Sequence, residues 1–222
     1  MNIVTTEFNG KPFHYREGNY GDLLTMKENL YGKQYGALEL TMQDVVLDIG
    51  GHIGTFAIPT SLKVDQVISI EMAKDNYELL ELNTKPYKDI QVYNYACVSQ
   101  KTAGQQVEYY LGAKNSGATS SHIKRGREGP FKAESIGIEE VLEDIQPTII
   151  KCDVEGAEYD IFDSLKLPDC VRQIIIEFHF GHKEWRDNAN LIQKNLKKQG
   201  FKFDEVDCTQ DKLWIRVMYF KR

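Results

Sequence analysis

The sequence contains no hydrophobic run that approaches a membrane span, for which about 20 consecutive apolar residues are needed. Only four of its 222 residues are cysteines, and no two are spaced as C-x-x-C, which disfavours a zinc site built from cysteines. Cys97 and Cys152 fall within apolar segments and are expected to be small buried side chains. No stretch has the pattern of a secretory signal peptide, so we expect a reducing, cytoplasmic setting.

An excess of positive charge is also missing. Lysine and arginine number 27 against 33 aspartates and glutamates, which gives a formal net charge of −6. Surfaces that bind nucleic acid are usually basic, so nucleic acid is disfavoured as a partner. Hydrophobic residues make up 41% of the chain, which is typical of a globular protein, and the length fits a single domain over residues 1–222.

From residue 45 onward, apolar segments with the character of strands alternate with segments of helical spacing. This alternation predicts an α/β fold, in which helices cover both faces of a parallel sheet. Residues 1–42 precede it and are expected to form a hairpin with Asn9-Gly10 as its turn, followed by a helical cap. Residues 112–130 are rich in glycine and serine and are expected to be a long mobile loop.

The positions of the expected elements follow from the same pattern. The expected strands are 45–49, 66–71, 90–98, 148–153, 171–179, 200–207 and 212–220, and the expected helices are 53–62, 75–84, 138–144 and 184–198. The last two strands are close in sequence, so we expect them to pair antiparallel.

The most informative segment runs from Val45 to Gly54 and reads VVLDIGGHIG. It predicts an apolar strand that carries an acid near its end, then a glycine-rich turn and the start of a helix. Glycine lets a ligand approach the backbone closely, and the free N–H groups at a helix start face that ligand. Such an arrangement is typical of a site for a nucleoside-containing cofactor at the carboxyl end of a parallel sheet.

The spacing and charge of this turn indicate which cofactor is expected. Dinucleotide sites use G-x-G-x-x-G, whereas here Gly50 and Gly54 are separated by three residues and Asp48 stands just ahead of them. A carboxylate there would repel a pyrophosphate and attract the sulfonium and ammonium of S-adenosylmethionine. Glu71 ends the next expected strand, where a carboxylate can accept hydrogen bonds from ribose hydroxyls. We therefore expect S-adenosylmethionine rather than a nicotinamide cofactor.

Ionisable residues end two further strands that are otherwise apolar. Lys151 and Asp153 share one face of the first, and Glu177 and His179 share one face of the second. If the two strands are neighbours, these four candidate catalytic side chains meet at one edge of the sheet. Lys151 would then neutralise Glu177 and leave Asp153 and His179 nearer the mouth. His179, with an ordinary pKa of about 6.5, is the expected general base, and Asp153 is the alternative.

The same region offers the ligands of a metal site. Asp153, Glu155 and Glu177 carry the hard oxygen ligands that Mg²⁺ prefers. The spacing does not require an ion, and the nearby lysine and histidine disfavour one, so we predict no metal. Glu158 is expected to complement the dipole of the following helix, and His52 to be a surface residue at a helix start.

Two motifs resemble the FkbM family of S-adenosylmethionine-dependent methyltransferases: VLDIGGHIG at 46–54 and IKCDVEGAE at 150–158. The similarity spans about residues 35–180. It also takes in Glu71, the helix that contains Asn83, Ala96-Cys97-Val98-Ser99 and Ile176-Glu177-Phe178-His179. This sequence has Gly51-His52 where members of the family often have alanine and asparagine.

The resemblance implies a Rossmann-like class I methyltransferase fold, with a seven-stranded, mostly parallel sheet of order 3-2-1-4-5-7-6. It implies O-methylation of a sugar or another small molecule. The acceptor, a small molecule or glycan, would be bound by the N-terminal segment and residues 112–130. The expected cofactor-binding residues are Asp48, Gly50, Gly51, Gly54, Glu71, Ala96 and Asp153, the last of them beside the transferred methyl group.

Other functions remain open from the sequence. A methyltransferase that acts on nucleic acid or protein is one alternative, although the DNA amino-methylating motif [DNS]-P-P-[YFW] is replaced here by Asp153-Val154-Glu155-Gly156. A module that binds the cofactor without chemistry is another. Loss of Asp48 or Glu71 would favour that alternative, and both residues are present.

Overall fold

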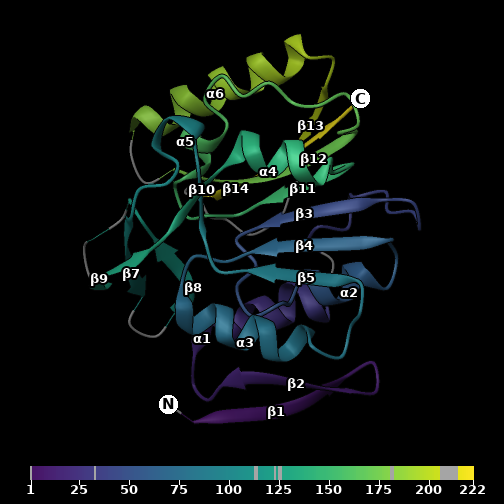
Figure 1. The fold of residues 1–222 in the computed structure, drawn as a ribbon, viewed down its shortest axis with the longest axis vertical. Coiled ribbons are helices and arrows are strands. Elements are labelled where there is room, and N and C mark those ends of the chain that lie inside the picture. Colours follow the sequence, from purple (N-terminus) through teal and green to yellow (C-terminus); the bar gives the residue numbers. More distant parts are fainter. Residues whose placement is uncertain are drawn as a thin grey trace.

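A computed structural model describes residues 2–32, 34–112, 115–122, 124, 127–180, 183–205 and 215–222. A mixed sheet of seven strands forms the centre of the molecule (Figure 1). Its members are β3 (Val45–Ile49), β4 (Gln66–Ile70), β5 (Ile90–Tyr93), β11 (Ile149–Cys152), β12 (Gln173–His179), β13 (Lys202–Glu205) and β14 (Ile215–Lys221). They lie in the order β13-β14-β12-β11-β3-β4-β5. Strands β5, β4, β3, β11 and β12 pair parallel, whereas β14 runs antiparallel to both β12 and β13.

Both faces of this sheet are buried. Successive side chains of each strand point to opposite faces, so neighbouring residues belong to different hydrophobic clusters. Leu47 and Ile49 pack in one cluster with residues of α4 (Ile138–Ile145) and α6 (Lys183–Lys198). Val46, the residue before Leu47, points to the other face and belongs to a second cluster with Tyr35 and Phe56, just ahead of α2 (Ala57–Ser61). The predicted α/β class is therefore confirmed, and it explains why the central strands are mostly apolar rather than alternating between apolar and polar residues.

The N-terminal segment forms the expected hairpin from β1 (Ile3–Phe8) and β2 (Lys11–Arg16), with Asn9 and Gly10 at positive φ in the turn. The hairpin is followed by α1 (Tyr20–Thr25) and a π-helical turn (Met26–Leu30). In Figure 1 the hairpin lies outside α1 and α3 (Lys74–Thr84). Asn83 of α3 accepts a hydrogen bond from the His14 N–H at 2.7 Å and donates one to the His14 carbonyl at 2.9 Å, which fixes the hairpin to the central fold.

Two expected elements are divided or shortened. The expected strand 90–98 is interrupted after β5, where the Asn94 side chain donates hydrogen bonds to the carbonyls of Glu71 and Met72. The chain then leaves the sheet as β6 (Ala96–Val98), which pairs with β10 (Ser135–Gly137). The expected helix 53–62 is only the five residues of α2, because Gly54 has φ of +92° and residues 52–56 form turns and a bend. After β11 the chain continues into the short helix α5 (Glu158–Ile161).

The segment expected to be irregular, 112–130, contains a strand. β8 (Asn115–Ser120) and β9 (Arg127–Ala133) flank β7 (Val107–Gly112) in a three-stranded antiparallel sheet. Backbone hydrogen bonds between these strands hold the sheet together. The segment has no alternation of apolar and polar residues, so its sequence did not predict a strand. Residues 113, 114, 123, 125 and 126 lie outside the described residues, and the mobility of the segment stays a prediction. Among the described helices, none is both long and apolar enough to cross a membrane.

Candidate active site

A cavity of about 1560 Å³ lies at the carboxyl ends of β3, β4, β11 and β12. The residues that follow or end these strands line it: Gly50, Glu71, Asp153 and Glu177. Residues of α1 and β8 form the opposite wall, among them Tyr20, Leu24, Asn115 and Ser116. The cavity is therefore enclosed by the sheet on one side and by the N-terminal segment and the 112–130 region on the other.

The glycine turn brings β3 against the end of β11. Gly50 has φ of +86°, and a Cβ atom there would lie 1.8 Å from the Asp153 carbonyl oxygen, so only glycine fits. A Cβ at Gly51 would lie 2.1 Å from Ser69 Oγ, and Gly54 also has a positive φ. Gly50 lines the cavity, whereas Gly51 and Gly54 are not among its lining residues. These two glycines pack the turn, and their expected contact with a cofactor stays a prediction.

Asp48 and Lys151 form a buried ion pair below the cavity, because their strands are in register at these positions. The Lys151 Nζ lies 3.0 Å from Asp48 Oδ1, and neither side chain is more than 4% exposed. The same ammonium donates a hydrogen bond to the Gly50 carbonyl at 2.7 Å, and Ser69 Oγ donates to Asp48 Oδ2 at 2.8 Å. Neither charged residue lines the cavity.

This pair corrects one expectation. Lys151 forms its ion pair with Asp48 on the adjacent strand rather than with Glu177. Asp48 is fully buried, and its expected contact with a cationic cofactor stays a prediction. Burial raises the pKa of Asp48 even with the ammonium beside it. Both residues hold the glycine turn in place.

Glu71 lies at the tip of β4 and reaches the cavity, as expected for a cofactor-binding acid. Its Oε2 accepts the His52 N–H at 2.9 Å, and its Oε1 accepts the Ala73 N–H at 2.8 Å. Burial raises its pKa, although these two bonds favour the ionised form. Asn76 Nδ2 donates a third bond at 3.4 Å, which leaves acceptor capacity on the carboxylate for a ligand. Ala96, the other expected contact beyond β4, also lines the cavity.

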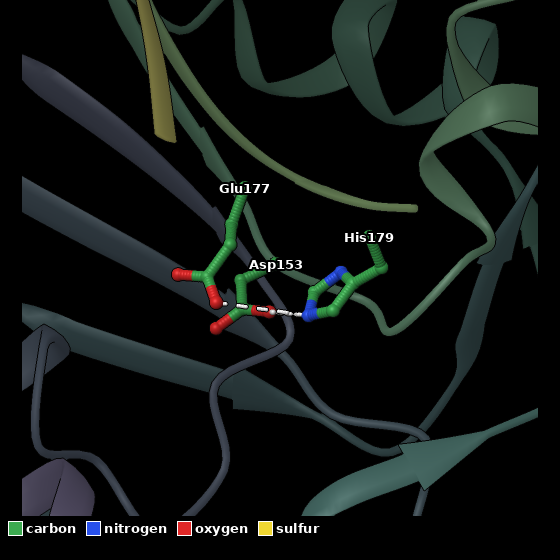
Figure 2. A group of neighbouring side chains, drawn as sticks. All are labelled: Asp153, Glu177 and His179. Atoms are coloured by element: carbon green, nitrogen blue, oxygen red, sulfur yellow. Dashed lines mark ion pairs between the residues drawn. The ribbon is translucent and has the colours of Figure 1, made fainter. Parts of the chain in front are cut away.

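Asp153, Glu177 and His179 meet at the ends of β11 and β12, as predicted from two neighbouring parallel strands. Figure 2 shows the two carboxylates turned toward the same edge of the imidazole ring. The His179 Nε2 lies 3.9 Å from Asp153 Oδ1, 3.6 Å from Glu177 Oε1 and 3.5 Å from an oxygen of Glu155. His179 is buried behind the acids, whereas Asp153, Glu155 and Glu177 line the cavity.

A shell of buried donors and acceptors orients this cluster. The Tyr35 hydroxyl is 3.3 Å from both Asp153 Oδ2 and Glu177 Oε2, and Gln34 Nε2 donates to Glu177 Oε2 at 2.9 Å. On the other side, Glu158 accepts the N–H groups of Gly156 and His179 at 2.7 and 2.8 Å. Glu158 is therefore a buried structural acid rather than a surface residue that only complements a helix dipole.

The charges in the cluster act on the pKa of the histidine. Burial would lower the pKa of His179, but Glu158, Glu155 and Glu177 outweigh it and raise that pKa well above the ordinary value. The expected role of His179 as the general base stays a prediction. Burial and the Asp153 charge also raise the pKa of Glu177.

Sequence reasoning missed Tyr35 and misplaced His52. Tyr35 falls in the expected helical cap of residues 1–42, where its spacing does not mark it as a partner of acids more than a hundred residues further along the chain. His52 is buried rather than on the surface: its Nε2 is 2.7 Å from Ser116 Oγ and its Nδ1 is 3.2 Å from Thr25 Oγ1. It ties the glycine turn to α1 and β8, which are far apart in sequence.

Comparison with known proteins agrees with this arrangement. A family model described as the methyltransferase FkbM domain matches residues 48–203. Among solved structures, a methyltransferase FkbM from Methylobacillus flagellatus KT has a TM-score of 0.55 and 18% identity; the match covers 85% of this chain and 46% of that one. The chain thus spans less than half the length of that structure. No curated protein sequence matches.

Two further structures share the fold. Fibrillarin from Aeropyrum pernix, in complex with S-adenosyl-L-methionine, has a TM-score of 0.52 and 12% identity over 98% of this chain and 82% of that one. Trm5b from Pyrococcus abyssi has a TM-score of 0.54 and 11% identity over 99% and 55%. The sheet and the cavity at its strand ends define a class I methyltransferase fold. The chain belongs to the FkbM methyltransferase family, whose cofactor is S-adenosylmethionine.

Proposed function

We propose that this chain O-methylates a hydroxyl group of a sugar or another small molecule, with S-adenosylmethionine as the methyl donor. The observation that carries the proposal is the position of Glu71 and Asp153. They belong to strands on opposite sides of β3 and line one cavity, separated by the Gly50 turn. Glu71, the acid proposed to bind the ribose, and Asp153, the acid proposed to act on the acceptor hydroxyl, are thereby held at a fixed spacing.

The residues present fit the cofactor. Glu71 retains acceptor capacity for ribose hydroxyls, and Ala96 offers a small apolar side chain beside it. Gly50 lines the cavity without a side chain, and a larger residue there would meet the Asp153 carbonyl. Bound there, S-adenosylmethionine supplies an electrophilic methyl group. The protein's own contribution is to position the acceptor and to receive its proton.

The cavity also has room for an acceptor. Single small-molecule sites measure roughly 300–1000 Å³, whereas this cavity measures about 1560 Å³. Its acidic wall, from Asp153, Glu155 and Glu177, suits a neutral hydroxyl that must lose a proton and repels a polyanion. The opposite wall, from α1 and β8, supplies Asn115 as a hydrogen-bonding group for a sugar. These features favour a small molecule or glycan over nucleic acid.

Binding of the product cofactor tests the donor half of the proposal. S-adenosylhomocysteine is expected to raise the melting temperature of the wild type, because a ligand that binds only the native state stabilises it. Glu71→Gln should reduce this shift, since an amide replaces one acceptor oxygen. Glu78→Gln, an exposed glutamate on α3, serves as the matched control and should leave the shift unchanged. Absence of any shift at millimolar ligand would contradict the cofactor site.

Transfer of a labelled methyl group tests the acceptor half. We expect label from S-adenosylmethionine to enter small molecules or glycans of a fractionated extract and not its RNA. Asp153→Asn should reduce this transfer far more than it reduces S-adenosylhomocysteine binding, because the amide cannot take up a proton. Full transfer by Asp153→Asn, or label found in RNA, would overturn the proposed chemistry or acceptor class.

A further inference from the structure

We infer that Asp153, Glu177 and His179 form a binding site for one divalent transition-metal cation, with Mn²⁺ as the best match. The inference reverses the sequence-based expectation of no metal. It deepens the proposed function, on which the role of the cation rests, although cation binding itself can be measured independently.

The geometry of the three side chains fits an ion. One ligand atom from each lies within 4.8 Å of the other two. Metal bonds to nitrogen and oxygen of about 2.1 Å place ligand atoms about 3.0 Å apart at right angles and about 4.2 Å apart across the ion. The separations from His179 Nε2, 3.6 Å to Glu177 and 3.9 Å to Asp153, fall between these limits. They are too long for hydrogen bonds.

The histidine supplies an independent sign of a ligand. Its side chain is only 7% exposed, and Nε2 has no hydrogen-bond partner among the described residues, although it points into the acidic cluster. Buried polar atoms without a partner are rare in folded proteins and call for an explanation such as an ion. A neutral imidazole that binds a metal through Nε2 would satisfy this atom.

The surroundings orient the ligands in the way metal sites require. A metal-binding histidine usually directs its other ring nitrogen at a carboxylate, and His179 Nδ1 lies 3.4 Å from the fully buried Glu158 Oε1. The Tyr35 hydroxyl lies beside the far oxygens of Asp153 and Glu177, which leaves Asp153 Oδ1 and Glu177 Oε1 on the histidine side. Three groups are thus held in place around one point.

The charge balance also favours a cation. Lys151, which the sequence placed with Glu177, forms its ion pair with Asp48 instead. Carboxylate oxygens of Asp153, Glu155 and Glu177 all lie within 3.9 Å of His179 Nε2, so three acids gather at one point. One imidazole nitrogen together with carboxylate oxygens suits Mn²⁺ better than Mg²⁺ or Ca²⁺, which prefer oxygen ligands alone. The three proposed ligands include no thiolate, the ligand type that favours zinc.

The open side of the ion would face the cavity, because Asp153 and Glu177 line it while His179 lies behind them. A hydroxyl oxygen of the acceptor could complete the coordination there. A hydroxyl bound to a divalent cation loses its proton more readily, which is the task that the proposed function assigns to these acids.

Titration of protein stripped with EDTA tests the site, with MnCl₂ as the probe and the EPR signal of free Mn²⁺ as the readout. We expect saturable binding of one ion per chain. Asp153→Asn and Glu177→Gln should each weaken it at least about tenfold. Asp160→Asn is the matched control: this aspartate lines the same cavity and contacts a histidine, His122, yet lies outside the cluster, so its variant should bind like the wild type.

Pulsed EPR of Mn²⁺ bound to the wild type provides a test that needs no variant. Coupling to one imidazole nitrogen is expected. Absence of saturable binding, absence of nitrogen coupling, or unchanged affinity in both ligand variants would each overturn the site. Mn²⁺ binding without any response to S-adenosylhomocysteine would instead leave the site standing and refute the proposed function.

Discussion

Replacement of Lys151 by methionine would decide whether this lysine is a structural partner or a catalyst. Its Nζ lies 3.0 Å from Asp48 Oδ1 in a pair whose side chains are 4% and 0% exposed, and it also donates to the Gly50 carbonyl. Methionine keeps the apolar stem but leaves the Asp48 carboxylate buried without a cation. Loss of one partner of a buried pair costs about 3–5 kcal/mol.

The pH dependence of this loss follows from the carboxylate. The least costly response of the variant is to keep Asp48 protonated in the folded state. For a carboxyl with an unfolded pKa of about 3.9, protonation costs about 4 kcal/mol at pH 7 and about 1.5 kcal/mol at pH 5. Because the folded pKa is raised above the unfolded one, the penalty is largest at high pH and disappears as the pH falls toward the unfolded pKa.

Urea unfolding followed by tryptophan fluorescence measures these differences, with thermal melting as a second assay. At pH 7 we expect Lys151→Met to lower the melting temperature by roughly 6–20 °C, given about 2–4 °C per kcal/mol at this chain length. The double variant with Asp48→Asn should be less destabilised, since no buried charge remains. Lys74→Met, at a lysine 73% exposed, is the control and should change little. A variant of normal stability that lacks methyl transfer, or equal losses at pH 5 and pH 7, would refute the structural role.

Two further predictions concern stability. Gly50→Ala should destabilise the fold by at least about 2 kcal/mol and weaken S-adenosylhomocysteine binding, because its Cβ would meet the Asp153 carbonyl and φ is positive. Gly104→Ala, with a positive φ but nothing within 4 Å, should cost only about 1–2 kcal/mol in urea unfolding; equal losses would contradict the steric argument. Burial would raise the pKa of Asp44, but hydrogen bonds, first from Arg172, lower it to about 2. This stabilisation, about 2–3 kcal/mol, is present above the unfolded pKa and is lost as the pH falls toward 2, so urea midpoints of wild type and Asp44→Asn should converge from pH 6 to pH 3. A constant difference would refute it.

The features that sequence reasoning predicted well depend on local pattern. Strand and helix alternation follows from burial of both sheet faces, which makes β3, β11 and β12 mostly apolar and buried along nearly their whole length. The meeting of Asp153, Glu177 and His179 required only that two parallel strands be neighbours and end at the same edge. Glu71 was found for the same reason, because it ends the strand on the other side of β3.

The errors all concern contacts that the local pattern does not encode. The partner of Lys151 depends on register, which sets it beside Asp48 of one neighbouring strand and Ile175 of the other. Tyr35 reaches the acids from a segment more than a hundred residues away in sequence. Likewise, β8 exists because β7 pairs with it, and its residues show no periodicity of their own.

Two groups of charged residues lie at the ends of the central strands: the Asp48–Lys151 pair and the cluster around Asp153. They differ in how far their charges are balanced. Asp48 and Lys151 balance one another, are fully enclosed and support the Gly50 carbonyl, so no ligand is needed to complete them. Two residues beyond Lys151, Asp153 begins a layer in which several carboxylates share one imidazole and open onto the cavity. In a site of low dielectric, uncompensated charge interacts most strongly with whatever positive group enters. The outer layer is accordingly where a sulfonium, a metal ion or the developing charge of the reaction gains the most from this protein.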